Sequence, residues 1–388
     1  MKKFITITAI FLIVITESRG QKQVINDDFI TIDVRKRYPK KELILQDFMD
    51  VEYIVLDNAD EFVCQGIVLA VGKEIIFVRN EINDGDIFIF DRKGKGIRKI
   101  NRRGQGPEDY TRIYEIIPDE DNNEMFVNDP RGIIVYDLYG KYVRSFRKNE
   151  GSNYMFLQNF NSEYLICRET TLDINDKSTE SQPFAIISKK DGSIYKDIRI
   201  RFKQGKNARV GVGVNNGVPV SVAPRVNSII PLRDNWILTE LSNDTVFNLL
   251  PDFSMVPFLV RTPSIQSMNP EVFLYPGIHT DRYYFIETLK AEFDYKTNKG
   301  FPTTQLMYDT QEKTLYESIV YNSDYSNKKT VDMSKANKNN DIAFWHKLEA
   351  FELIDSYKKG ELKGKLKEVA EGLDEDSNPV IMLVKYKK

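Results

Sequence analysis

The chain has 388 residues, of which 41% are hydrophobic and 29% are charged, a composition typical of a folded protein. Its 55 basic and 57 acidic residues give a formal net charge of −2 at pH 7, which excludes a strong basic field for binding nucleic acid or an anionic membrane. With 20 tyrosines and 23 phenylalanines, it is rich in side chains that favour β-strands.

The first 20 residues have the pattern of a signal peptide. Lys2 and Lys3 precede an apolar run over residues 4–16, and the small residues Ser18 and Gly20 fit a cleavage after Gly20. The apolar run is short for a membrane span. Because no cysteine follows it where a lipid would attach, we expect export to the periplasm or cell surface, and not as a lipoprotein.

A hairpin motif recurs along the chain. Residues 87–100 and 133–146 both read as a strand, an Asp-x-x-Gly-Lys turn and a second strand, with the aspartates at Asp91 and Asp137. The aspartate can accept hydrogen bonds from turn amides, and the glycine permits a positive φ. A weaker copy spans residues 186–195. Two degenerate copies span residues 246–256 and 306–315.

Two further apolar segments precede each of these turns, so each unit is expected to contain four strands. The segments lie at 67–71 and 74–78, 113–117 and 124–127, 154–158 and 164–167, 226–232 and 236–240, and 273–279 and 283–287. Four short strands per unit at this spacing are typical of β-propeller blades. A β-sandwich also has many short strands but would not repeat one hairpin motif in register, so it ranks second.

Longer segments interrupt the units at residues 169–182, 202–225 and 289–302. The middle one is rich in glycine and proline. Loops of this length inside a compact domain are usually functional or mobile, and we expect them to mark the working surface.

The last unit departs from the pattern. Residues 341–346 can form its innermost strand, residues 348–373 carry apolar side chains at helical spacing, and residues 380–386 return as a strand. Because this unit lacks strands, we assign residues 51–56 to its outer edge, where pairing with the C-terminal strand closes the ring. Residues 29–34 are expected to add to the same edge.

These units together predict a single all-β domain over residues 21–388. It is a six-bladed β-propeller with a short helical insertion in the last blade. The two cysteines, Cys64 and Cys167, fall in strands two blades apart, which is too far for a disulfide. We therefore expect two buried thiols.

A resemblance to a known family rests on the segment from Asp91 to Tyr110, which contains Arg-Arg-Gly-Gln-Gly-Pro-Glu-Asp-Tyr at residues 102–110. It resembles the signature of a large family of secreted six-bladed β-propeller proteins of Gram-negative bacteria, which reads roughly FDxxGKFIxxIGRxGQGPGEY. That fold is similar to NHL-repeat and TolB-like propellers. The strand at residues 51–56 fits as well.

The resemblance covers roughly residues 30–388. This sequence departs from the family pattern at Gly96, where an aromatic residue is usual, and at Asn101, where glycine is usual. It also has Asp109 one place after Glu108, where the family pattern has Gly-Glu. The family has no established common activity, so the resemblance implies architecture and export more than chemistry.

The segment 102–110 is expected to join the outer strand of the first blade to the inner strand of the second, at one mouth of the central channel. Candidate ligand-binding residues there are Arg102, Arg103, Gln105 and Glu108. The interpretation that we favour is a connector whose polar groups hold neighbouring blades together, because placement in a fold is weak support for function.

The sequence contains no recognisable nucleophile or phosphate-binding motif. Its two histidines, His279 and His346, are predicted at the ends of inner strands in adjacent blades, where they could meet and bind a metal, although no Cys/His ligand spacing is present. The acids Asp281, Glu287 and Asp341 could form a calcium site. We predict no catalytic centre and no resident cofactor.

Three functions remain open. The favoured one is a non-enzymatic binding or scaffold module that presents a loop-rich propeller face to a protein, peptide or glycan. The second is a channel-centred, metal-assisted hydrolase or lyase. The third is a structural envelope component without a small ligand. We expect no nucleic-acid partner and no transmembrane segment after signal cleavage, and the sequence leaves the oligomeric state open.

Overall fold

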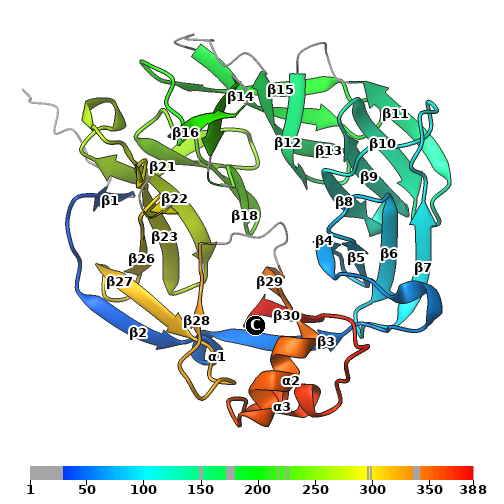
Figure 1. The fold of residues 1–388 in the computed structure, drawn as a ribbon. Helices are drawn as coiled ribbons and strands as arrows, with labels where there is room; N and C mark the ends of the chain where they lie inside the picture. The colour runs from blue at the N-terminus through cyan, green and yellow to red at the C-terminus, as the bar shows by residue number, and fades with distance from the viewer. Residues whose placement is uncertain are drawn as a thin grey trace, which may run out of the picture.

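The computed structural model describes residues 29–387 except 148–151, 172–179, 209, 216–217, 223, 225–226, 295–296, 298 and 335–340. Its strands form six sheets arranged radially around the channel axis of a propeller (Figure 1). The predicted all-β, six-bladed propeller is therefore confirmed. The predicted signal peptide at residues 1–20 lies outside the described residues.

The first three blades each contain four antiparallel strands, and the first strand of each is innermost (Figure 1). Blade one comprises β4 (Ile67–Val71), β5 (Ile75–Arg79), β6 (Asp86–Asp91) and β7 (Gly96–Asn101). Blade two comprises β8 (Glu115–Asp119), β9 (Glu124–Asp129), β10 (Gly132–Asp137) and β11 (Tyr142–Arg147). Blade three comprises β12 (Ser152–Asn159), β13 (Tyr164–Thr171), β14 (Glu180–Ser188) and β15 (Ile194–Arg201).

Blades four and five each gain an outer strand from the N-terminal segment, which runs parallel to its neighbour. Blade four comprises β18 (Ile229–Leu232), β19 (Asn235–Leu238), β20 (Thr245–Leu249), β21 (Met255–Thr262) and then β1 (Ile30–Asp33). Blade five comprises β22 (Val272–His279), β23 (Tyr283–Lys290), β26 (Thr303–Asp309), β27 (Thr314–Tyr321) and then β2 (Lys40–Ile44), with the short β28 (Thr330–Val331) also beside β27.

The expectation that residues 29–34 extend the sixth blade is wrong. β1 instead pairs with β21 of blade four, from Ile30 opposite Leu259 to Asp33 opposite Thr262. The reason is hydrophobic burial: Ile32 is completely buried in a core cluster shared by blades four and five. Strand patterning alone indicated an edge strand but did not indicate which blade would accept it.

Blade six combines both ends of the chain. It comprises β29 (Ile342–Leu348), β30 (Val380–Tyr386) and β3 (Met49–Val55), with β3 and β30 antiparallel over their full length. Between β29 and β30 lie the helices α2 (Ala350–Lys358) and α3 (Gly364–Glu371), which pack through Leu353 and Leu366 onto Val380. A single helical turn, α1 (Leu45–Phe48), links β2 to β3.

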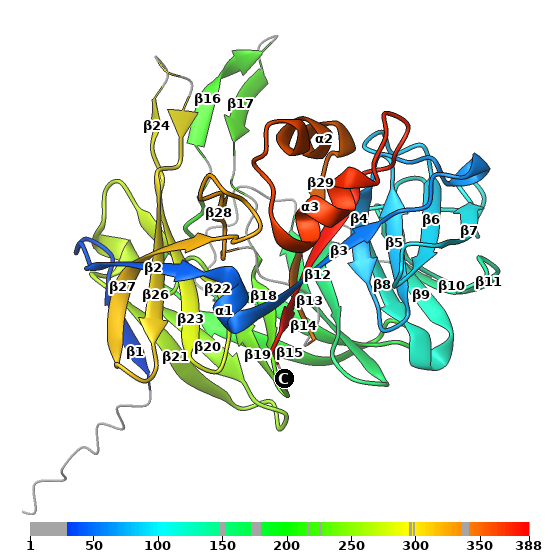
Figure 2. The ribbon, with the colours of Figure 1, turned by 90° about the horizontal axis from the view of Figure 1, so that it is seen from below.

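The innermost strand of blade six runs opposite to that of blade five. Thr280, just beyond the end of β22, and Tyr386, at the end of β30, line the same pocket. Tyr386 N donates to Asp341 O, so the start of β29 lies where β22 ends. The end of β29, with α2 and α3, therefore lies at the other face of the ring (Figure 2).

The repeated hairpin turns have the mechanism expected from their sequence. Asp91 Oδ1 accepts from the amides of Lys93 and Lys95. Asp137 Oδ1 accepts in the same way from the amides of Tyr139 and Lys141. Gly94 and Gly140 have φ values of 87° and 84°. A Cβ on either would overlap the outer strand of the preceding blade, so glycine is needed for both conformation and space.

Hydrophobic clusters fill the interfaces between neighbouring blades. The cluster between blades six and one contains Cys64, and the cluster between blades two and three contains Cys167. Both cysteines are buried free thiols, as predicted. Because every blade packs on two neighbours, the core is a ring of interfaces around the channel.

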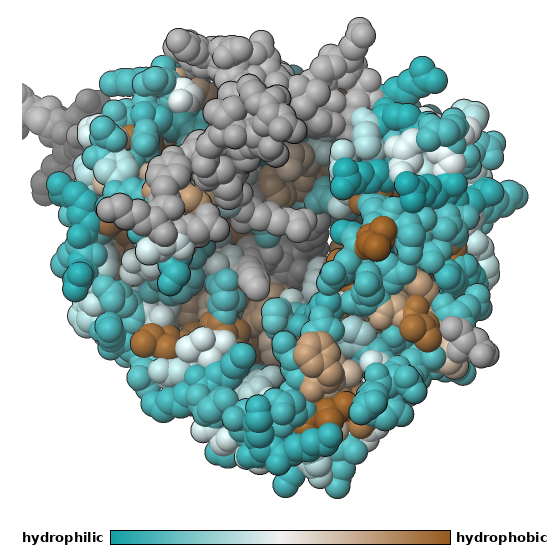
Figure 3. All heavy atoms as spheres, in the orientation of Figure 1, coloured by the Kyte–Doolittle hydropathy of each residue, from teal (hydrophilic) through white to brown (hydrophobic). Residues whose placement is uncertain are grey.

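The two faces of the ring differ. On the insert face, as we call it, the hairpins β16 (Val210–Asn215) to β17 (Val218–Val222) and β24 (Phe293–Asp294) to β25 (Lys299–Gly300) project beside α2 and α3 (Figure 2). Outside the grey atoms, this face is largely hydrophilic (Figure 3). The opposite, turn face carries the turns between the first and second strands. No helix in the described part of the chain is long and apolar enough to cross a membrane.

Candidate functional site

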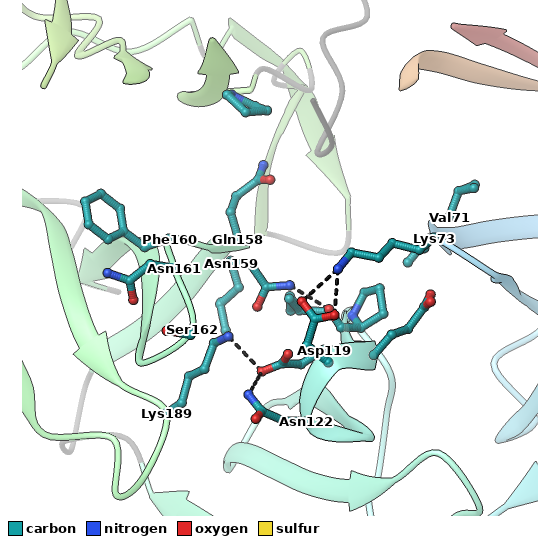
Figure 4. Close-up of a pocket in the computed structure, with 18 of the residues that line it drawn as sticks. Val71, Lys73, Asp119, Asn122, Gln158, Asn159, Phe160, Asn161, Ser162 and Lys189 are labelled. Atoms are coloured by element: carbon teal, nitrogen blue, oxygen red, sulfur yellow. Dashed lines mark hydrogen bonds and ion pairs between the residues drawn. The ribbon is translucent and has the colours of Figure 1, made fainter. Parts of the chain in front are cut away.

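A pocket of about 670 Å³ opens at the channel mouth on the turn face, and we call it the channel-mouth pocket (Figure 4). Short polar segments that follow the inner strands form most of it. They contribute from blades one to four, and Trp345 on β29 adds a wall from blade six. The lining includes residues 70–73, 116–122, 157–162 and Lys189, together with Pro231, Arg233, Asp234, Trp236 and Pro251.

A buried ion pair joins blades two and three in the wall of this pocket. Lys189 Nζ lies 2.7 Å from Asp119 Oδ2, and both side chains are 7% exposed (Figure 4). Asn122 Nδ2 donates to the same oxygen at 2.9 Å. Desolvating two charges is expensive, and the pair is tolerated because each charge finds its partner at short range.

Two further cations at the rim are also paired. Lys73 reaches both oxygens of Asp121 at 2.6 and 2.7 Å, and Arg233 forms an ion pair with Asp281. Both pairs are solvent-exposed, so each contributes little stability. Every cation of the lining thus has a carboxylate partner, and the acids Glu120 and Asp234 also line the pocket, so the site offers no unpaired cation to an anion.

Amide side chains provide most of the uncharged polar surface. Asn159 Nδ2 donates to Pro118 O at 2.5 Å, which ties the end of blade three's inner strand to blade two. Asn161 Oδ1 accepts from the amides of Glu163 and Tyr164 and so shapes the β12–β13 turn. Ser162 lies beside them on the rim and is exposed.

One side of the pocket is aromatic. Trp236 on β19 stacks against Phe160 of the β12–β13 turn, with ring centroids 6.0 Å apart and an interplanar angle of 21°. Trp345 lies on blade six, across the channel mouth. Flat apolar rings beside amides and paired charges give the pocket both polar and apolar recognition surfaces.

The two histidines do not converge in the structure. His279 is 5% exposed, between the rings of Phe258 and Tyr284, and it lines a separate pocket of about 530 Å³ on the turn face. Burial lowers its pKa to about 4, so the imidazole is neutral at pH 7. His346 is exposed and lines a third pocket beside α2, because β29 runs in the opposite direction.

The acids considered for a calcium site are also dispersed. Asp281 pairs with Arg233 on the turn face, whereas Glu287 lies on β23 and accepts from Gln305. Burial and the nearby Asp332 raise the pKa of Glu287. Among the described residues, no group of three or more His, Cys, Asp or Glu side chains is placed to hold a metal ion.

The segment 102–110 makes many contacts between blades one and two. Tyr110 is completely buried, and its hydroxyl donates to Gly85 O and accepts from Arg102 N. Arg102 Nε donates to Gly140 O, and Tyr136 Oη donates to Glu108 O. These bonds support the connector interpretation.

The four residues singled out in this segment differ in placement. Arg102 is half-buried, with its guanidinium on Gly140 O, whereas Arg103, Gln105 and Glu108 are exposed. None of the four lines the channel-mouth pocket. Whether they bind a ligand stays a prediction.

Sequence reasoning did not identify the residues of the channel-mouth pocket. Asp119 and Lys189 come from different blades, and neither belongs to a motif with a known chemistry. A usable signal was the short polar run that follows each inner strand, such as Pro-Asp-Glu-Asp-Asn-Asn at residues 118–123.

Comparisons with known proteins agree with this architecture. A solved structure from Bacteroides fragilis, whose name reads "putative exported protein", is similar, with a TM-score of 0.58 and 13% identity over 90% of this chain and 99% of that one. At this identity the likeness shows the fold alone.

Other solved structures match with TM-scores below 0.5, and nothing about this chain is inferred from them. They include the calcium-binding protein regucalcin from Agrobacterium tumefaciens, with a TM-score of 0.38 and 10% identity over 90% of this chain and 97% of that one. Another is a protein of unknown function from Bacteroides thetaiotaomicron, with a TM-score of 0.33 and 12% identity over 70% of each chain.

Among curated proteins, none matches the sequence. A family model described as a domain of unknown function, DUF4934, matches residues 29–385. That range takes in all six blades and the N-terminal strands that pair with the last three of them. The chain belongs to the DUF4934 family.

Proposed function

We propose that this protein is an exported binding module and that its ligand occupies the channel-mouth pocket. The observation that carries the proposal is the makeup of that pocket: it is concave, its cations are paired with carboxylates, and amides and aromatic rings line it. Such a surface suits recognition of a polar ligand.

The same groups are poorly placed for proton transfer. A general acid or base must reach its substrate and exchange a proton near the working pH. The carboxylate of Asp119 is held by Lys189 and Asn122, and that of Asp121 by Lys73. These partners favour binding over catalysis as the role of this pocket.

The proposed location is outside the cytoplasm, with the mature chain starting at or near Gln21 and carrying no lipid. The support is the signal-peptide pattern of residues 1–20 and the fold shared with an exported protein. Mass spectrometry of the secreted product tests this. An intact Met1 or an acylated cysteine would contradict it.

Blocking the pocket tests the binding proposal. Ser162→Trp places a large side chain on the exposed rim of the pocket, and Gln105→Trp makes the same change at the candidate loop. Thermal-shift screening of oligosaccharides and peptides should give ligands that stabilise the wild type and Gln105→Trp but not Ser162→Trp. The opposite pattern would move the site to the loop, and turnover of a ligand would show an enzyme.

A further inference from the structure

Five aromatic rings form a continuous row from the channel-mouth pocket across blades three and four, and we call it the aromatic strip. Its members are Trp236, Phe160, Phe253, Tyr195 and Tyr164. Neighbouring centroids lie 6.0, 5.6, 5.8 and 4.4 Å apart in that order. The row begins inside the pocket, because Trp236 and Phe160 line it.

Exposure increases from Trp236 to Tyr195. Trp236 is 8% exposed, Phe160 and Phe253 are half-buried, Tyr195 is 55% exposed, and Tyr164 beyond it is half-buried. A packing role in the core does not require an aromatic side chain at so exposed a position. The Tyr195 ring is therefore accessible to an extended ligand whose inner end lies in the pocket.

The chemistry around the aromatic strip selects the class of ligand. Each cation of the pocket is paired with a carboxylate, so an anionic polymer finds no unpaired cation there. Asn161 and Ser162, which are exposed at the rim, suit a partner with many hydroxyl groups. Ring faces suit a partner with flat C–H surfaces. Sugar rings combine hydroxyl edges with C–H faces and so match both kinds of surface.

We propose that the aromatic strip and the channel-mouth pocket together bind an uncharged oligosaccharide chain, with one end in the pocket and successive sugar rings along the strip. This inference rests on the proposed binding function and names its ligand class. It assigns Tyr195 to the outer part of the chain and Phe160 to the junction between strip and pocket.

Chain length gives the sharpest test. Cellohexaose, maltohexaose and xylohexaose, each with its disaccharide, are titrated calorimetrically into the full-length protein. At least one hexasaccharide should bind more tightly than its disaccharide. Tyr195→Ala should weaken that hexasaccharide about five- to tenfold and leave the disaccharide unchanged, because the lost ring contacts only the outer sugars.

Tyr139→Ala is the matched control. Tyr139 is 66% exposed between β10 and β11 of blade two and does not line the pocket, so this variant should bind like the wild type. Phe160→Ala should weaken both chain lengths, and circular dichroism would show whether it is folded. Equal loss in Tyr195→Ala and Tyr139→Ala would refute the role of the aromatic strip.

The failure of this inference can be told from failure of the proposed function. If only a mixed peptide library or oligogalacturonate binds, and Ser162→Trp abolishes that binding, the pocket is a binding site but the ligand class is wrong. If no sugar or peptide binds the wild type, both proposals are wrong. Binding of a neutral hexasaccharide that Ser162→Trp and Tyr195→Ala both weaken supports both.

Discussion

Protonation of His279 should destabilise this protein in mild acid. The imidazole is 5% exposed, and burial lowers its pKa to about 4 from the usual value of 6.5. Because the folded pKa is the lower one, the unfolded chain binds more protons between these values, and stability is lost as the pH falls from 6.5 to 4. The full shift amounts to about 3 kcal/mol, and about 2 kcal/mol is already lost at pH 5.

The charged neighbours of His279 do not offset this loss. Its pocket also contains Arg233, Arg282, Asp281 and Lys387. Arg233 is paired with Asp281, and Arg282 with Asp309, so no carboxylate there is dedicated to an imidazolium. Proton NMR is suited to the measurement, because the chain has only two histidines.

His279→Phe is the informative variant, since it keeps a flat ring between Phe258 and Tyr284 and removes the titrating group. Thermal unfolding should show a smaller loss of stability between pH 7 and pH 5 in this variant than in the wild type. An NMR titration should show one histidine that stays neutral down to about pH 4. If His279 titrates near 6.5, or the variant loses as much stability as the wild type, the reasoning is refuted.

Three further predictions follow from packing and topology. Lys189→Met should lower the free energy of unfolding by about 3–5 kcal/mol, because it leaves Asp119 buried without its cation. Calorimetry should show that combining it with Asp119→Leu restores part of this lost stability. Urea unfolding should show that Gly94→Ala lowers stability more than Gly360→Ala does. Both glycines have a positive φ, but only at Gly94 would the added Cβ overlap a neighbour, Val55 O. Deleting residues 21–56 should expose three blade edges and cause aggregation in light scattering, and unchanged thermal stability would refute ring closure by this segment.

The parts of the fold that could be predicted from the sequence are those set by local chemistry. Asp91 and Asp137 reveal their hairpins because the turn needs an acceptor and a positive φ within a few residues. The antiparallel pairing of β3 with β30 was expected because residues 51–56 had no blade of their own. These inferences need only strand patterning and the counting of strands per blade.

Features set by long-range geometry were beyond reach. The strand at Ile30–Asp33 looks like any edge strand, and its place on blade four depends on where Ile32 is buried. The ion pair of Lys189 with Asp119 joins two blades, and neither residue carries a local signal. Pockets at a propeller mouth are assembled from one turn per blade, so a single sequence shows their components only as separate turns.

The N-terminal segment completes the last blade of the ring. β29 begins at the turn face and ends at the insert face, where α2 and α3 follow it. β30 then returns to the turn face, antiparallel to β29. The C-terminal segment contributes β29 and β30 to blade six, and β3 pairs with β30 at the outer edge. The chain reaches β3 from the outer edge of blade five, where β2 pairs with β27, through the single helical turn α1.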